Sequence, residues 1–129
     1  MRYLAPLLVI FSLFLSVPAP AHDEDPSHDA WYRTLMQPDN PQTPCCGESD
    51  AYWADEVHVK DGRVFATITD DRPDGPLQRD HIAIGTVIEI PQKKVKNSQG
   101  NPTGHSILFG APGRDGEFYV YCYVQAGGV

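Results

Sequence analysis

The alternation of apolar and polar side chains is clearest near the end of the chain, over residues 117–124. Side chains of a β-strand point alternately to its two faces. One face would hold Phe118, Val120, Cys122 and Val124, and the other would hold Tyr119, Tyr121 and Tyr123. Because aromatic and β-branched residues favour strands, we predict a central strand here, with Cys122 facing the core.

A second signal is Asp61-Gly62, which separates two alternating runs at 57–60 and 63–69 and is typical of a two-residue hairpin turn. Such a turn would pair Lys60 with Arg63 and Val59 with Val64. His58 and Phe65 would then meet on one face. The other face would be apolar and contribute to the core through Val57, Val59, Val64, Ala66 and Ile68.

Two further strands are predicted at 81–90 and 105–110, the second joined to the last strand by a hairpin turn at 111–116. The first would turn one apolar face to the core through Ile82, Ile84, Ile88 and Ile90. Residues 70–80 and 93–104 are expected to be polar loops. The aspartates of the first loop lack the spacing of a calcium-binding loop, so we interpret them as a solvated turn; they are Asp70, Asp71, Asp74 and Asp80.

One short helix is predicted before the strands. Ser27 can cap its start, and Trp31 with Leu35 and Tyr32 with Met36 have the spacing of one apolar helix face. Pro38 would end it, and the proline-rich residues 37–50 would form a loop. Five strands, one helix and no β-α-β alternation predict a mainly β fold, with a small antiparallel sheet curled into a barrel or sandwich.

Residues 1–21 have the features of a secretory signal peptide. Arg2 supplies the positive charge, residues 4–17 form an apolar stretch shorter than the roughly 20 residues that cross a bilayer, and Ala19-Pro20-Ala21 is a small-residue cleavage site. Cleavage after Ala21 would make His22 the first residue of the mature chain. We therefore expect a periplasmic or secreted protein, not attached to the membrane after cleavage.

The charge of the chain is acidic. Its 129 residues carry 17 acidic and 10 basic side chains, a net charge of −7, and loss of Arg2 would make the mature chain more acidic by one unit. Nucleic acids and anionic membranes select basic patches, so neither is an expected partner. An unidentified protein or small ligand is the expected partner.

The three cysteines predict one disulfide and one unpaired thiol in an exported protein. Cys122 could pair with Cys45 or with Cys46, and we favour this long-range bridge over a strained bridge between the two neighbours. The chain then divides into a signal peptide at 1–21, an N-terminal tip with the short helix and the proline-rich loop at 22–44, and a disulfide-linked β domain at 45–129.

Five segments together resemble a group of small exported proteins of Gram-negative bacteria for which no activity is established. The matching segments are His28-Asp29-Ala30-Trp31-Tyr32, Cys45-Cys46-Gly47-Glu48-Ser49-Asp50, Gly85-Thr86-Val87-Ile88 with Pro91, Asn101-Pro102-Thr103-Gly104-His105 and Val120-Tyr121-Cys122-Tyr123-Val124. Members of the group often have another cysteine where this chain has Ala51. The resemblance implies export and one compact domain, and it implies no activity.

A metal site is one functional hypothesis. A mature N-terminal His22 would offer its amine and its imidazole to copper, and His28 follows among acidic residues. Alternatively, His22 is only the residue that follows the cleavage site, because a metal site also needs fixed geometry. We favour this second interpretation and expect no cofactor, with copper as the alternative.

The remaining hypotheses concern binding and catalysis. The three tyrosines of the last strand and His105 could form a binding surface, or the tyrosines could pack under the aromatic residues Trp31, Tyr32 and Trp53. No pattern of catalytic residues is recognisable, so a thiol- or histidine-dependent enzyme ranks last. The sequence favours a non-enzymatic binding or interaction module.

Overall fold

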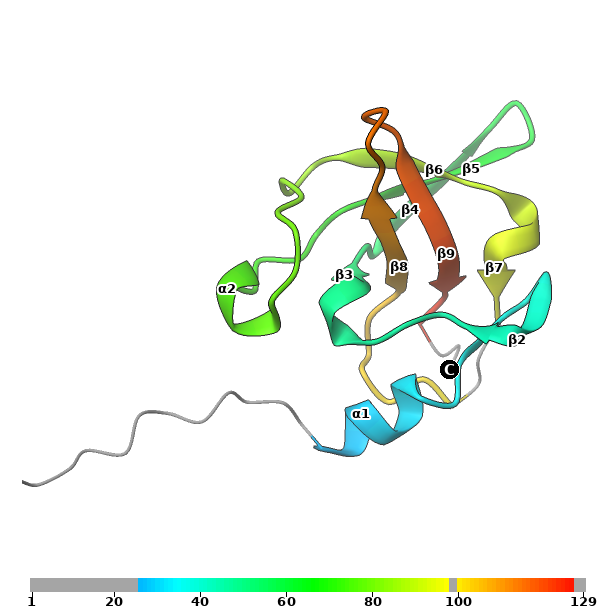
Figure 1. Cartoon of the computed structure of the whole chain (residues 1–129). Helices are drawn as coiled ribbons and strands as arrows, with labels where there is room; N and C mark the ends of the chain where they lie inside the picture. The colour runs from blue at the N-terminus through cyan, green and yellow to red at the C-terminus, as the bar shows by residue number, and fades with distance from the viewer. Residues whose placement is uncertain (1–25, 98–99, 127–129) are drawn as a thin grey trace, which may run out of the picture.

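The computed structural model describes residues 26–97 and 100–126, which form a mainly β fold (Figure 1). The helices are α1 (Pro26–Tyr32) and α2 (Asp74–Leu77), with 3-10 turns η1 (Glu48–Asp50) and η2 (Gln92–Lys94). The strands are β1 (Met36–Gln37), β2 (Asn40–Pro44), β3 (Ala51–Trp53), β4 (Glu56–Lys60), β5 (Arg63–Thr67), β6 (Val87–Ile90), β7 (Val95–Lys96), β8 (Ile107–Pro112) and β9 (Phe118–Val124).

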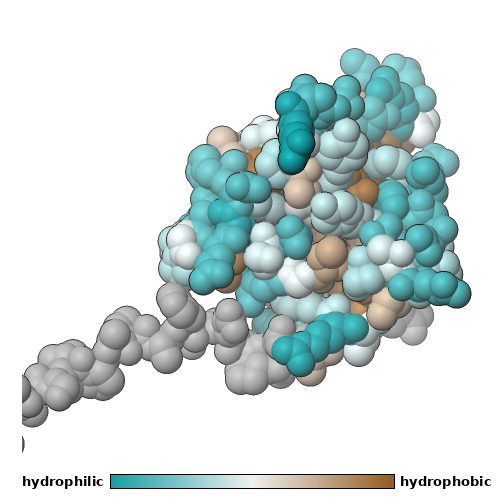
Figure 2. Space-filling view, viewed as in Figure 1, coloured by the Kyte–Doolittle hydropathy of each residue, from teal (hydrophilic) through white to brown (hydrophobic). Residues whose placement is uncertain are grey.

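The strands form three sheets, and the middle one supplies both hydrophobic cores. This central sheet has the order β3-β8-β9-β7, the outer sheet has the order β4-β5-β6, and β1 and β2 form a separate hairpin. One core lies between the central and outer sheets, because it combines Tyr52, Leu108 and Tyr123 with Ala66, Ile68, Ile88 and Ile90. The other covers the opposite face of the central sheet with residues of α1 and of the segment after it. From the side of α1, hydrophobic side chains show only in small separate areas (Figure 2).

An extra residue in β9 overturns the predicted alternation of that strand. Phe109 pairs with Cys122 but the next residue, Gly110, pairs with Val120, so Tyr121 is left unpaired as a β-bulge. As a result Phe118 and Val120 pack with Tyr123 in the core shared with the outer sheet. Tyr121 packs instead with Cys122 and Val124 in the core under α1. The predicted common face of the three tyrosines is therefore wrong.

The hairpin around Asp61-Gly62 is confirmed, including its register. Lys60 pairs with Arg63, Val59 with Val64 and Val57 with Ala66, and the rings of His58 and Phe65 stack at 5.2 Å. Its predicted core face is only half correct. Ala66 and Ile68 are buried, but Val57 and Val59 are 40% and 67% exposed because they lie on β4, an edge strand of the outer sheet, and belong to neither core.

Three other elements differ from the prediction. The strand expected at 81–90 contains only β6, and Ile84 is 62% exposed. The helix ends at Tyr32, because the chain turns there with hydrogen bonds from Thr34 N–H to the Trp31 carbonyl and from Leu35 N–H to the Tyr32 carbonyl. The loops expected at 37–50, 70–80 and 93–104 contain the short elements β2, η1, α2 and β7.

The fold class is mainly β as predicted, but its details need correction. The described residues form nine strands in three sheets and two short α-helices, not five strands and one helix, and they do not close into a barrel. The central sheet is also mixed, because β7 pairs with β9 in parallel. The packing of the outer sheet on the central sheet is sandwich-like.

The disulfide joins Cys45 to Cys122 across 77 residues of sequence and leaves Cys46 as a free thiol. Both bridged cysteines are fully buried in the core under α1. The long-range bridge is thereby confirmed, and Cys45 is the partner. The chain-entropy model gives about 4.5 kcal/mol for closing a loop of this length.

The predicted signal peptide, residues 1–21, lies outside the described residues. Across 26–97 and 100–126, no helix has the length and apolar character needed to cross a membrane.

Removal of the disulfide should destabilise the domain strongly. We expect the double substitution Cys45→Ala and Cys122→Ala to lower the free energy of unfolding by about 2–5 kcal/mol, because the unfolded chain regains the freedom of a long loop. Urea unfolding followed by tryptophan fluorescence measures this. Cys46→Ala is the matched control, and an equal loss in the control would contradict the prediction.

Gly110 should not tolerate a side chain. A Cβ atom there would overlap the Tyr119 carbonyl oxygen and the Phe118 ring, so we expect Gly110→Ala to cost about 3 kcal/mol. Gly47, which has open space around it and a φ of −101°, provides the control. Gly47→Ala should change the stability by no more than about 0.5 kcal/mol, and equal thermal shifts for the two variants would refute the explanation.

Candidate functional site

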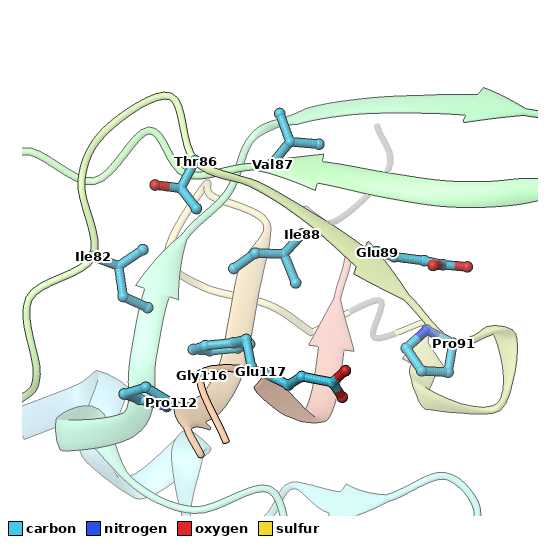
Figure 3. A pocket seen from close by; sticks show the side chains of 10 residues that line it. Ile82, Thr86, Val87, Ile88, Glu89, Pro91, Pro112, Gly116 and Glu117 are labelled. Carbon is cyan, nitrogen blue, oxygen red and sulfur yellow. The ribbon is translucent and has the colours of Figure 1, made fainter. Parts of the chain in front are cut away.

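An open cleft lies between the outer sheet and the tip of the β8–β9 hairpin. Its volume is about 760 Å³, within the range of sites that hold small ligands. One wall is formed by Ile82, Thr86, Val87, Ile88, Glu89 and Pro91, and the other by Pro112, Gly116, Glu117 and Phe118. Ile82 and Ile88 point from their wall toward the hairpin tip (Figure 3).

Backbone hydrogen bonds fix the wall that precedes β6. Gly85 N–H donates to the Ile68 carbonyl and Ile68 N–H donates to the Thr86 carbonyl, both at 2.9 Å. Gly85 has a φ of +88°, a conformation that favours glycine. Because of this turn, residues 81–86 do not extend β6 at its N-terminal end, and Ile82 lies beside the cleft.

The opposite wall is a tight turn. Gly113 N–H donates to the Glu117 carbonyl at 2.6 Å, and Gly116, with a φ of +81°, donates to the Gly113 carbonyl. Asp115 accepts hydrogen bonds from Glu117 N–H and from the Tyr119 hydroxyl. The pKa of Asp115 is lowered by these bonds. Hydrogen bonds within the turn therefore hold the hairpin tip in this conformation without a ligand.

The charged residues that line the cleft are both acidic. Glu89 is paired with Arg63, whose Nε donates to Glu89 Oε1 at 2.6 Å and whose Nη2 donates to Glu89 Oε2. This pairing lowers the pKa of Glu89. The Glu117 carboxylate makes no hydrogen bond or ion pair with a residue of the described ranges. A cation would therefore meet an unneutralised carboxylate at Glu117.

A buried ion-pair network anchors the segment that leads to the cleft. Asp70 accepts hydrogen bonds from the side chains of Arg72 and Arg79, and from the backbone N–H groups of Trp53 and Arg72. Arg79, with a side chain only 1% exposed, also donates to Asp74 Oδ1 and to the Ala51 carbonyl. The prediction of a solvated turn is wrong for Asp70, because this carboxylate is buried and its ion pairs offset the cost of removing it from water.

The pKa of Asp70 follows from these contacts. Burial alone would raise it, but the hydrogen bonds from Arg72 and Arg79 and from two backbone N–H groups hold it well below its ordinary value. Burial also raises the pKa of Tyr52 to about 12; its hydroxyl donates to the Asp80 carbonyl at 2.6 Å. Arg79 lies over the Tyr52 ring at 4.7 Å, so the network is packed against the core.

His105 belongs to a second structural cluster, around Trp53. Its ring stacks on Trp53 at 3.8 Å, and its Nδ1 lies 2.8 Å from Asp55 Oδ2. Arg72 lies 4.2 Å from the centre of the same indole ring. The His105 imidazole covers one face of the Trp53 indole ring, so the Arg72 guanidinium lies on the other face. His105 is half-buried and does not line the cleft.

The tyrosines proposed as a binding surface are separated by the bulge. Tyr119 is 52% exposed, Tyr121 is partly buried with Trp31 and Trp53, and Tyr123 is fully buried with its hydroxyl donating to the Ala54 carbonyl. Only Tyr119 therefore offers a largely exposed ring.

Of the two proposed metal ligands, only His28 belongs to the described part of the chain. His28 lies half-buried in α1, and His22 lies outside the described residues. Within 26–97 and 100–126, no three histidine, cysteine or acidic side chains are placed to hold a metal ion. The copper hypothesis stays a prediction.

The free thiol has the opposite character to an activated nucleophile. Burial, with a further contribution from Asp50, raises the pKa of Cys46, whereas reactive cysteines have a lowered pKa. Its backbone has a φ of +83°, and it directly follows the buried, bridged Cys45.

Comparisons with protein-family models, with curated proteins and with solved structures find no match.

The ion-pair network should make stability depend on pH. We expect Asp70→Asn to lower the free energy of unfolding by about 3 kcal/mol at pH 7, because the buried Arg79 loses one of its two carboxylate partners and keeps only Asp74. The folded-state pKa of Asp70 is depressed, so its contribution is present above about pH 4 and is lost as the pH falls below the ordinary aspartate pKa. Urea unfolding at pH 7, 4 and 2.5 should show the difference from wild type shrinking with acidification.

The exposed neighbour Asp71 offers a matched control, since Asp71→Asn makes the same chemical change one residue away. It should leave stability almost unchanged. Equal losses for the two variants, or a difference independent of pH, would contradict the role of Asp70.

Proposed function

We infer that this protein is a binding domain whose ligand occupies the cleft between β6 and the β8–β9 hairpin tip. The ligand we propose is an apolar group that carries a positive charge. The observation that carries the proposal is the combination of apolar side chains on both walls, Ile82, Ile88 and Phe118 among them, with a Glu117 carboxylate that is unpaired within the described residues; the residues that line the cleft include no basic one. The acidic net charge of the chain would also attract a cation.

Both walls of the cleft are held in place by their own packing, without a ligand, and such a preformed site favours selective binding. The Phe118 ring meets Tyr52 edge to face at 6.4 Å and so is fixed from the core side. Ile88 is 8% exposed and belongs to the same core. A rigid apolar floor reduces the ordering cost of binding.

A periplasmic or secreted location is part of this proposal. The buried Cys45–Cys122 disulfide is of the kind that persists in oxidising compartments. The signal peptide predicted from the sequence at residues 1–21 points to the same location.

Charge selectivity tests the proposal. Dodecyltrimethylammonium and dodecyl sulfate, both below their micelle concentrations, are titrated into labelled protein, and the amide resonances of Ile88 and Phe118 are followed. We expect saturable shifts with the cation and none at these positions with the anion. Glu117→Gln should weaken binding of the cation by about two- to fivefold, the effect of losing one exposed charge pair.

The matched control is Glu56→Gln, on the opposite edge strand of the outer sheet. It makes the same chemical change and should not alter the affinity. Equal binding of cation and anion, or equal weakening by both variants, would overturn the proposed ligand class.

A further inference from the structure

β6 is an edge strand whose unpaired side faces the cleft. It pairs only with β5, and no backbone hydrogen bond joins it to β9 among the described residues. Four consecutive residues, 86–89, line the cleft although their side chains point alternately to the two faces of the outer sheet. The cleft therefore reaches the edge of the strand itself, as well as one of its faces.

The hydrogen-bond pattern identifies which backbone groups of β6 are available. Ile68 N–H donates to the Thr86 carbonyl, which makes this pair hydrogen-bonded, and such pairs alternate along an antiparallel ladder. With Thr67 opposite Val87 and Ala66 opposite Ile88, Ile88 bonds β5 while Val87 and Glu89 turn their N–H and C=O groups outward. Val87 and Glu89 thus each present one free N–H and one free C=O group to the cleft.

The other free edge of the outer sheet, β4, lacks these surroundings. All five of its residues are exposed, and none of them lines the cleft. Charged Glu56 and Lys60 lie at its two ends, an arrangement that discourages strand addition. The edge of β6 instead has an apolar floor of Ile88 and Phe118, and opposite it lies Glu117, which is unpaired within the described residues.

We propose that the ligand is an extended peptide that adds to the edge of β6 as a further strand. Its backbone bonds Val87 and Glu89, an apolar side chain contacts Ile88 and Phe118, and a basic side chain pairs with Glu117. This inference rests on the proposed function of the cleft. It narrows the ligand to a polypeptide, because no simple amphipathic cation satisfies alternating donors and acceptors along a strand edge.

N-methylated peptides test strand addition without altering the protein. The probe is an acetylated, amidated heptapeptide of alternating valine and threonine with arginine at its centre, titrated into the labelled full chain. Two analogues carry two N-methyl groups each, one at the third and fifth residues and one at the fourth and sixth. An edge strand bonds only every second residue of its partner, so one analogue should bind at least about tenfold more weakly and the other within about threefold of the parent.

Hydrogen exchange locates the bound strand. The Val87 and Glu89 amides should become protected, whereas protection of Val57 and Val59 instead would assign the peptide to β4 and overturn the inference. Replacing the central arginine by glutamate should weaken binding at least about threefold. Equal weakening by both methylated analogues, or no protection of Val87 and Glu89, would also overturn it.

The two proposals fail in different ways. If dodecyltrimethylammonium binds the cleft and the peptide does not, strand addition is wrong while the cleft remains a cation-binding site. If neither binds, both proposals are wrong.

Discussion

The central sheet supplies two hydrophobic cores, and the bulge at Tyr121 determines which side chains of β9 enter each of them. Before the bulge, Phe118 and Val120 face the outer sheet. After it, Cys122 and Val124 face α1 while Tyr123 takes over on the outer-sheet side. Without the extra residue, Cys122 would point away from Cys45, and the disulfide could not form. The close approach that Gly110 allows is the local condition for this geometry.

Features that depend on neighbouring residues were predictable from the sequence. The hairpin of β4 and β5 has its predicted register because Asp61-Gly62 defines the turn and alternation fixes the faces. The pairing of Cys122 with one of the adjacent cysteines was predictable because only three cysteines exist. Which of the two bonds depended on tertiary packing, which buries Cys45 and leaves Cys46 partly exposed.

Features that depend on distant contacts were not predictable. Asp70 was interpreted as solvated because its sequence neighbours are polar, yet it is buried, paired with Arg79, and accepts a hydrogen bond from the distant Trp53 N–H. The three tyrosines were assigned to one face because a bulge leaves no clear signal in an alternating run. The cleft combines the 82–91 segment with the hairpin tip, two parts of the chain that no local pattern connects.

The buried network and the cleft are joined by the chain between them. Arg79 is fixed against Tyr52 and Asp70, and Ile82 follows three residues later at the rim of the cleft. A segment with little regular structure is therefore ordered by charge at one end and by the hydrogen bonds of Ile68 at the other. This explains how a wall without a strand can remain rigid.

The Cys45–Cys122 bond also decides how the domain would respond to mechanical force. A pull applied through the segments before Cys45 and after Cys122 passes directly through the covalent bridge. Every strand from β3 to β8 lies outside that path, as does the wall that holds β6. While the disulfide is intact, tension can detach α1 and the β1–β2 hairpin, but it cannot extend the chain that forms the binding cleft's outer-sheet wall.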